Sequence, residues 1–257
     1  MPGLSISIVT YNNEQTIGAT LRSLLDHLPK NLAVWIYLVD NDSTDQTVSI
    51  AKTFVPRIVL LQSSQGNIGF GAAHNLVLRY LESTVHIIMN PDITINDDQT
   101  LSILHDYLHD HLDVGMIVPR IFNEQGELQY LCRRHLTVFD LIIRFLPWHL
   151  FRAKEDFHQM KDHDYSKSFT VEFASGCLMA IRTELLKSLQ GFDQRFFLYA
   201  EDADLTRRVN QISQTLYIPE AVVIHKWERS SYKSLRMTLI HLMSLVRYFQ
   251  KWGWSFK

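Results

Sequence analysis

The stretch LSISIVTYNN, residues 4–13, begins as an apolar run rich in β-branched side chains and ends in a polar turn. A helical pattern follows it, because Ile17, Leu21, Leu24 and Leu25 recur at the spacing of one helix face. This order of segments predicts a strand, a turn and a helix. Such a unit is the building block of parallel α/β sheets.

The unit recurs through the first 95 residues. Further strands are predicted at residues 34–39, 58–62 and 85–89, with helices over residues 46–54 and about 72–81. Strands that alternate with helices predict an α/β fold with a doubly wound, mostly parallel, Rossmann-like sheet. Ligands of such sheets bind beyond the carboxyl ends of the strands, which is where the polar loops of this chain fall.

After residue 95, the sequence predicts a less regular order of strands and helices. Helices are expected at residues 99–111, 183–190, 202–212 and 233–252, and strands at residues 114–122, 127–131, 169–181 and 215–224. Residues 154–167, rich in charge and histidine, are predicted to form an exposed loop. We expect one domain over residues 1–231, with a nucleotide-binding lobe at 1–95 and an acceptor and catalytic lobe at 96–231. A C-terminal helix is expected over residues 232–257.

The composition excludes several classes of protein. The net charge is -2 and no basic stripe is present, so a nucleic-acid partner is not expected. Two cysteines are too few for a disulfide framework, and the N-terminus lacks the features of a signal peptide, which favours a cytoplasmic setting. No run reaches the ~18 apolar residues that a membrane-spanning helix needs.

Two acidic loops are predicted to meet at one edge of the sheet. Asp40, Asp42 and Asp45 crowd the loop after the second strand, and carboxylates this close repel unless hydrogen-bond donors or a cation use them. Helix capping explains that loop equally well. The turn from Asn90 to Asp92 ends another buried strand on the same edge, which favours a ligand or cation site there.

Short motifs then follow one another in the order typical of one family. They are SIVTYNNEQTI (7–17), VDNDSTD (39–45), GNIGFGAAHN (66–75), MNPD (89–92), GCLMAIR (176–182), FFLYAEDADLTRR (196–208) and VIHKWERSS (223–231). Over nearly its whole length the chain resembles the inverting family 2 glycosyltransferases of the GT-A fold, within them the bacterial rhamnosyltransferase-like branch.

This resemblance implies a metal-dependent enzyme that makes cell-surface polysaccharide. Its donor would be a nucleotide-diphosphate sugar, with dTDP-L-rhamnose favoured, and its acceptor a carbohydrate or a lipid-linked intermediate. A UDP-hexose-dependent transferase and a catalytically silent nucleotide-sugar binding protein remain open. A nucleotidyltransferase is disfavoured, because the first strand ends in Tyr11-Asn12-Asn13-Glu14 instead of a loop rich in Gly and Arg.

The resemblance also implies a set of donor-binding residues. Thr10, Tyr11 and Asn12 would meet the base and ribose, and Asp40 would accept a hydrogen bond from the imide N–H of the base. The residues that would line the diphosphate and the sugar are Asn67, Gly69, Phe70, Asn75 and Asn90. A loop carrying Arg229 and Lys233 would close on the diphosphate, although a solvated connector is an equally good interpretation.

Catalytic and metal-binding residues are implied in the same way. Asp202 would be the base that deprotonates the acceptor hydroxyl, with Glu201 beside it, although both could be ordinary charges at a helix start. Asp92 and His225 would hold Mg²⁺ or Mn²⁺, although a lone histidine after a strand is often a surface residue. Asn90 stands where the family usually has an aspartate, so the cation would rely on Asp92, diphosphate oxygens and water.

The last expectation concerns two apolar, aromatic segments. The C-terminal helix carries an apolar band beside Arg236, Arg247 and Lys251, and residues 136–151 have the same character. Packing against the core or in a homodimer is the first interpretation. Peripheral contact with the inner face of a membrane is the second, because aromatic residues and flanking cations suit an interfacial helix.

Overall fold

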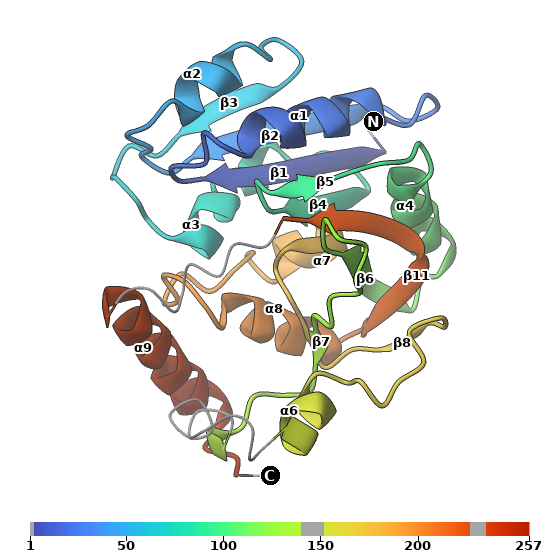
Figure 1. Cartoon of the computed structure of the whole chain (residues 1–257), viewed down its shortest axis with the longest axis vertical. Coiled ribbons are helices and arrows are strands. Elements are labelled where there is room, and N and C mark those ends of the chain that lie inside the picture. Colours follow the sequence, from blue (N-terminus) through green and yellow to red (C-terminus); the bar gives the residue numbers. More distant parts are fainter. Residues whose placement is uncertain (1–2, 140–151, 227–234, 257) are drawn as a thin grey trace.

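The computed structural model describes residues 3–139, 152–226 and 235–256. The strands of its main sheet are β1 (Leu4–Thr10), β2 (Val34–Asp40), β3 (Val59–Gln62), β4 (Val85–Met89), β5 (Ile93–Thr94), β6 (Val114–Phe122), β8 (Phe169–Thr170), β10 (Leu178–Arg182) and β11 (Gln214–His225). Their order is β3-β2-β1-β4-β10-β6-β11-β5, with β8 beside β11 (Figure 1). A small second sheet pairs β7 (Cys132–Arg133) with β9 (Phe173–Ala174).

Strand direction decides where the loops meet. β1 to β4 are mutually parallel, with Thr10 opposite Asp40 and Ile8 opposite Met89. β10 runs antiparallel to both β4 and β6, and β6 is parallel to β11. The ends of β1, β2 and β4 therefore lie at one edge, as expected for a largely parallel, doubly wound sheet.

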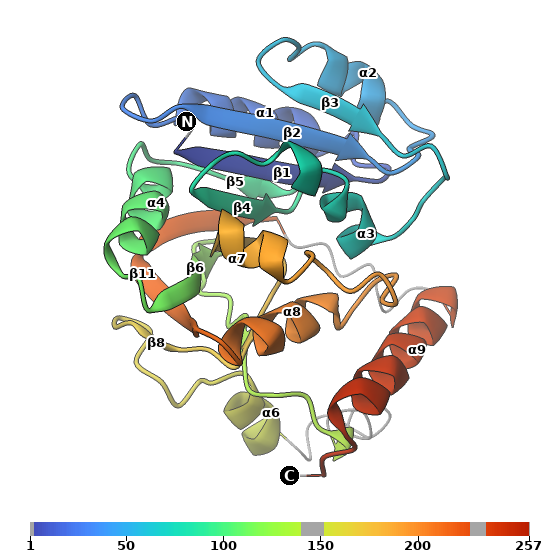
Figure 2. The ribbon, with the colours of Figure 1, turned by 180° about the vertical axis from the view of Figure 1, so that it is seen from behind.

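Helices cover both faces of the sheet. They are α1 (Ile17–Asp26), α2 (Thr47–Lys52), α3 (Phe70–Asn75), the 3₁₀ turn η1 (Leu78–Tyr80), α4 (Thr100–Asp110), α6 (Arg152–His158), α7 (Thr183–Ser188), α8 (Glu201–Asn210) and α9 (Leu235–Trp252). Leu21 of α1 and Leu104 of α4 are buried in one core cluster, whereas Ala73 of α3 and Leu205 of α8 are buried in another. The view from behind shows the second layer, with α7 and α8 in front of the sheet (Figure 2).

Several local predictions are wrong. The single strand predicted at residues 169–181 is three short strands, because β8 pairs with β11, β9 with β7 and β10 with β4. Residues 127–131 form no strand of their own beyond an isolated bridge from Leu128 to Phe122. The predicted loop at 154–167 begins inside α6, and the helix predicted at 72–81 is divided between α3 and η1.

The C-terminal helix α9 packs against the chain around α8. Leu245, Tyr248 and Phe249 are buried in a cluster with Phe196 and Ala203. Packing against the core is therefore confirmed for this face of the helix. Among the helices described, none is long and apolar enough to span a membrane. Most of the apolar segment at residues 136–151 lies outside the described residues.

Candidate active site

The loops after β1 and β2 are joined by hydrogen bonds between side chains and backbone. The Asn12 backbone N–H donates to Ser43 Oγ (2.9 Å), and the Thr44 N–H donates to Asn12 Oδ1 (2.8 Å). Asn12 has a left-handed φ of 56°, which asparagine adopts more readily than most residues. The two loops form one polar rim, on which Tyr11 is 48% exposed.

Asp40 is buried at the end of β2 beneath this rim. Its Oδ1 accepts from the Thr10 hydroxyl (3.3 Å) and its Oδ2 accepts from the Ser43 N–H (3.1 Å). Asp45 instead accepts from the backbone N–H groups of Glu14 and Thr47, so the capping interpretation holds for that carboxylate. Within the described residues, no group of three or more His, Cys, Asp or Glu side chains could hold a metal alone.

Asn41 ties the glycine loop, residues 66–71, to the end of β2. Its amide nitrogen donates to Asn67 Oδ1 (2.9 Å) and to the Gly69 carbonyl (3.3 Å), and its Oδ1 accepts from the Ile68 N–H (3.0 Å). Asn41 is fully enclosed, at 2% exposure. The sequence did not single out this residue, although its place directly after a buried strand was visible.

Asn75 has another partner. Its amide nitrogen donates to the Phe192 carbonyl (2.7 Å), and its Oδ1 accepts from the Phe192 N–H (2.8 Å). This two-way bridge fastens α3 to the chain that leads into α8. A bridging role was not predicted for Asn75, which was expected to line the donor.

Asp92 and His225 come together where β5 pairs with the end of β11. His225 Nε2 lies 3.4 Å from Asp92 Oδ1. The other ring nitrogen, Nδ1, is 3.0 Å from Gln129 Oε1, and the Gln129 amide donates to the His225 carbonyl (3.2 Å). Because an amide oxygen only accepts, Nδ1 carries the proton of this contact, and the other ring nitrogen, Nε2, faces Asp92.

These atoms fit a divalent cation. Asp92 Oδ1 is buried and has no hydrogen-bond donor among the described residues. A carboxylate oxygen and an imidazole nitrogen this close can both bind one cation. A histidine whose far nitrogen is fixed by an acceptor is also the usual arrangement in metal sites. The donor set therefore suits Mg²⁺ or Mn²⁺ if further oxygen ligands come from a diphosphate and water.

Glu201 and Asp202 begin α8 directly after two residues with left-handed backbone. Tyr199 has a φ of 71° and Ala200 a φ of 64°, a left-handed conformation that is uncommon for residues other than glycine. Asp202 Oδ2 accepts from the Gly176 N–H (3.0 Å) and its Oδ1 from the Ala203 N–H (2.9 Å). Glu201 is buried, and its Oε2 has no partner among the described residues.

The two carboxyl groups differ in how they hold protons. Burial raises the pKa of Glu201 to about 8, and the neighbouring charge of Asp202 acts in the same direction. Burial also raises the pKa of Asp202, while the N–H groups of Gly176 and Ala203 lower it. The backbone donors therefore favour the charged form of Asp202 over that of Glu201.

The glycine loop touches the segment that precedes this pair. The Phe70 N–H donates to the Phe197 carbonyl (3.0 Å). Gly69 has a φ of 91°, and a Cβ at this position would lie 2.2 Å from the Phe197 oxygen. Only glycine permits this approach. Gly176 in turn lies between the Phe70 ring and the Asp202 side chain, and the Cys177 carbonyl accepts from the Asn90 N–H (2.8 Å).

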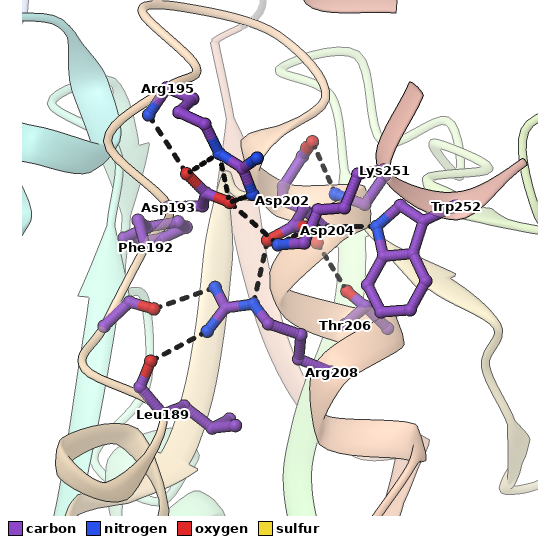
Figure 3. A network of polar contacts seen from close by, with 12 residues as sticks. Leu189, Phe192, Asp193, Arg195, Asp202, Asp204, Thr206, Arg208, Lys251 and Trp252 are labelled. Carbon is purple, nitrogen blue, oxygen red and sulfur yellow. Dashed lines mark hydrogen bonds and ion pairs between the residues drawn. The ribbon is translucent and has the colours of Figure 1, made fainter. Parts of the chain in front are cut away.

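A buried polar network fastens α8 to α9 (Figure 3). Asp204 Oδ2 accepts from Arg208 Nε (2.8 Å), and Asp204 Oδ1 accepts from Trp252 Nε1 (2.8 Å) and lies 2.6 Å from Lys251 Nζ. Lys251 also bonds to Asp193 (2.8 Å). Asp204 is fully buried, so its charge depends on these partners. The C-terminal end of α9 therefore holds the first turns of α8 in place.

The predicted site residues are largely brought together. A chain of contacts leads from Asp40 through Asn41 and the glycine loop to Phe197, and Gly176 and Cys177 link Asp202 to the turn that carries Asp92. Arg229 and Lys233 lie outside the described residues. The residues that the sequence did not predict are those that hold others in place, namely Asn41, Gln129, Asp204 and Trp252.

Residues 5–190 match the family model described as glycosyl transferase family 2. The chain belongs to this family. Among its relatives, the N-acetylglucosaminyl-diphospho-decaprenol L-rhamnosyltransferase of Mycobacterium tuberculosis is 25% identical over 239 residues, which cover 86% of this chain and 75% of the relative. Rhamnosyltransferase WbbL of Escherichia coli is 26% identical over 171 residues, 63% of this chain and 62% of WbbL. The family expected from the motifs is thereby confirmed.

Solved structures confirm the GT-A fold of this transferase. The mannosyltransferase PcManGT of Pyrobaculum calidifontis, in complex with GDP-Man and Mn²⁺, has a TM-score of 0.68 at 18% identity, covering 97% of this chain and 64% of its own. TarS 1-349 of S. aureus, in complex with UDP-GlcNAc, has a TM-score of 0.63 at 17% identity, covering 96% of this chain and 66% of its own. At such identities the likeness concerns the fold alone.

Proposed function

We propose that this family 2 glycosyltransferase moves a sugar from a nucleotide-diphosphate donor to a hydroxyl of a carbohydrate or lipid-linked acceptor, with inversion at the anomeric carbon. L-Rhamnose from dTDP-L-rhamnose is the favoured donor. The names of the curated relatives support the sugar, and one of them names a lipid-linked diphosphate. Both properties are carried to this chain as part of the proposal.

The observation that carries the proposal is the carboxyl pair at the start of α8. Asp202 accepts two backbone hydrogen bonds beside a Glu201 whose pKa is raised to about 8. A general base needs a pKa closer to neutrality than an ordinary aspartate has, and burial raises the pKa of Asp202 in that direction. The pair is linked through Gly176 and Cys177 to the turn that carries Asp92.

Asp202 would take the proton of the acceptor hydroxyl as its oxygen bonds to the anomeric carbon. The bond from that carbon to the diphosphate oxygen breaks on the opposite face, and the nucleoside diphosphate leaves with the electron pair. Thr10, Tyr11, Asn12 and Asp40 would hold the base and ribose. Asp40 offers acceptor oxygens to the imide N–H that thymine and uracil share, so these contacts do not separate the two nucleotides.

Asp92 and His225 would hold the divalent cation, and the proximity of His225 Nε2 to Asp92 Oδ1, which is unsatisfied within the described part of the chain, supports this assignment. Such a cation offsets the charge that develops on the leaving diphosphate. Gln129 would set the orientation of His225 through the bond to Nδ1. Asn67, Gly69, Phe70 and Asn90 would line the donor beside it.

The test is a panel of nucleotide sugars against thermal unfolding. We expect dTDP-L-rhamnose to raise the Tm more than UDP-glucose, UDP-GlcNAc or GDP-mannose, because a ligand that binds only the folded state stabilises it. The panel is run with Mg²⁺, with Mn²⁺ and with a chelator. A larger shift with a UDP-sugar would overturn the donor, and binding without turnover on any acceptor would favour a catalytically silent protein.

A further inference from the structure

A pocket of about 490 Å³ lies between α9, the segment 193–200 and the glycine loop. Its lining residues are Ile68, Gln194, Arg195, Phe197, Arg247, Gln250 and Lys251. None of these is acidic, and three carry positive charge. Ile68 and Phe197 also belong to the two segments that meet at Gly69, so the pocket borders the backbone that joins the donor loop to the carboxyl pair.

The charges around this pocket do not cancel. Asp193 pairs with Arg195 and Lys251, and Asp204 pairs with Lys251 and Arg208. Arg247 has no ion pair within the part of the chain that the structure describes, and its Nη1 donates to the Arg195 carbonyl (2.5 Å). The ion-pair network and Arg247 together thus contain four cations and two carboxylates, and three of the cations line the pocket. An excess of positive charge with unused guanidinium donors suits a phosphate group.

The helix that supplies Arg247 also carries an exposed apolar stripe. Leu235, Leu239, Met243 and Val246 recur at helical spacing and are 87%, 60%, 52% and 36% exposed. The core-facing side chains Leu245, Tyr248 and Phe249 lie on another face of α9. The stripe therefore has no partner among the described residues, and at residue 246 it adjoins the Arg247 that lines the pocket.

We propose that the pocket binds the phosphate of a lipid-linked acceptor and that the stripe of α9 contacts the first part of its apolar tail. A phosphate attached to an apolar chain matches both features at once, whereas a free nucleotide matches only the pocket and a neutral sugar matches neither. The inference rests on the proposed function for its acceptor. It adds a binding site for that acceptor, made by α9 and the segment before α8.

The probe is farnesyl diphosphate, a short isoprenoid diphosphate, titrated in chelator by calorimetry. Arg247→Gln is expected to weaken its binding about tenfold, since a lost charge-assisted hydrogen bond weakens binding by that order. Leu239→Ser is expected to weaken the binding of farnesyl diphosphate but to leave the binding of inorganic pyrophosphate unchanged. Arg22→Gln, an exposed arginine on α1, is the matched control and should bind like the wild type.

Two further arms separate the possible sources of binding. Asp92→Ala should bind the probe as the wild type does, because the pocket is distinct from the proposed metal pair. Equal binding to wild type and Arg247→Gln would overturn the proposal. So would binding only to phosphatidylglycerol vesicles, which would assign the surface to a bilayer headgroup. A concentration-dependent dimer that Leu239→Ser dissociates would overturn it as well, because a second copy would cover the stripe.

The same variants keep this inference apart from the proposed function. Arg247→Gln should retain the rise in Tm with the nucleotide sugar and should raise the acceptor KM without changing the donor KM. If no nucleotide sugar stabilises the protein, the proposed function fails, while the titration with farnesyl diphosphate still reports on the pocket. If donor binding is normal and the probe does not bind, only the acceptor site is wrong.

Discussion

The acidic groups at the strand ends belong to different strands, whereas Glu201 and Asp202 are direct neighbours at the start of α8. Asp40 accepts a hydrogen bond on each oxygen, and Asp92 keeps 21% of its side chain exposed beside His225. Glu201 is 4% exposed, has an oxygen without a hydrogen-bond partner among the residues that the structure describes, and follows two residues of left-handed backbone. The first arrangement offers single carboxyl groups as acceptors or ligands to a base or a cation. The second favours a proton that can move, because burial raises the pKa of both carboxyl groups.

The sharpest way to break this contrast is Asp202→Asn. It keeps the shape of the side chain and removes the proton acceptor, so we expect turnover to fall at least about a hundredfold with donor affinity nearly unchanged. Steady-state kinetics and donor-dependent Tm shifts on the same preparation measure both. Turnover close to that of the wild type would show that another group is the base.

Asp92→Ala tests the role proposed for the carboxylates at the strand ends. Loss of a carboxylate that offsets diphosphate charge should lower activity by about one to two orders of magnitude and weaken donor and metal binding together. Asp98→Ala, an exposed carboxylate paired with His27, is the control and should keep metal dependence intact. Full wild-type activity in excess chelator would contradict the metal role.

Gly69→Ala tests the backbone contact that joins the two regions. The new methyl would meet the Phe197 oxygen at 2.2 Å, so we expect a loss of more than about 2 kcal/mol of folding free energy and a matching loss of activity. Gly126→Ala is the matched control, because Gly126 also has a positive φ, of 79°, but open space around it. Chemical denaturation of both variants separates the cost of the clash with Phe197 from the cost of placing alanine at a positive φ. Equal losses of folding free energy in the two variants would show that the contact with Phe197 is unimportant.

Trp252→Phe tests the polar contact between α9 and α8. It removes one hydrogen bond from the buried Asp204 carboxylate while keeping an aromatic ring, so the expected loss is about 1–2 kcal/mol of unfolding free energy. Trp254→Phe, at an exposed tryptophan, should change the unfolding free energy by less than about 0.5 kcal/mol. Similar values for the two variants would mean that the network in Figure 3 contributes little.

Glu201→Gln should have the smallest effect on turnover at neutral pH, because the wild-type glutamate is already largely protonated there. A glutamate whose pKa rises from 4.5 to about 8 on folding stabilises the protein fully below pH 4.5, and that contribution is lost as the pH rises through about 8. The glutamine variant should therefore show a flatter dependence of unfolding free energy between pH 5 and about 8. A slope equal to that of the wild type would place the buried proton elsewhere.

Local sequence patterns predicted the first half of the fold well and the second half less well. β1, β4 and β6 have the predicted bounds, because each is a buried strand that polar residues delimit. Residues 169–181 could not be predicted, since β8 and β9 are two-residue strands whose partners lie in β11 and β7. Periodicity contains no information about such distant partners.

The candidate site likewise contains residues that the sequence predicted and residues that it did not. Carboxylates that directly follow a strand, such as Asp40 and Asp92, could be picked out because their position alone carries the signal. Residues that hold them through distant contacts could not. Gln129 meets His225 from a segment 96 positions away in sequence, and Trp252 meets Asp204 from a separate helix.

The contact between Gly69 and Phe197 has a consequence for how such an enzyme diversifies. Gly69 has no side chain and Phe197 contributes its carbonyl, so the spacing between the donor loop and the carboxyl pair does not depend on side-chain identity. Substitutions among the residues around the donor sugar can then change which donor is accepted without shifting the proposed catalytic base, Asp202, relative to that sugar. Descendants of one ancestor can inherit the same catalytic frame while their donor preferences diverge.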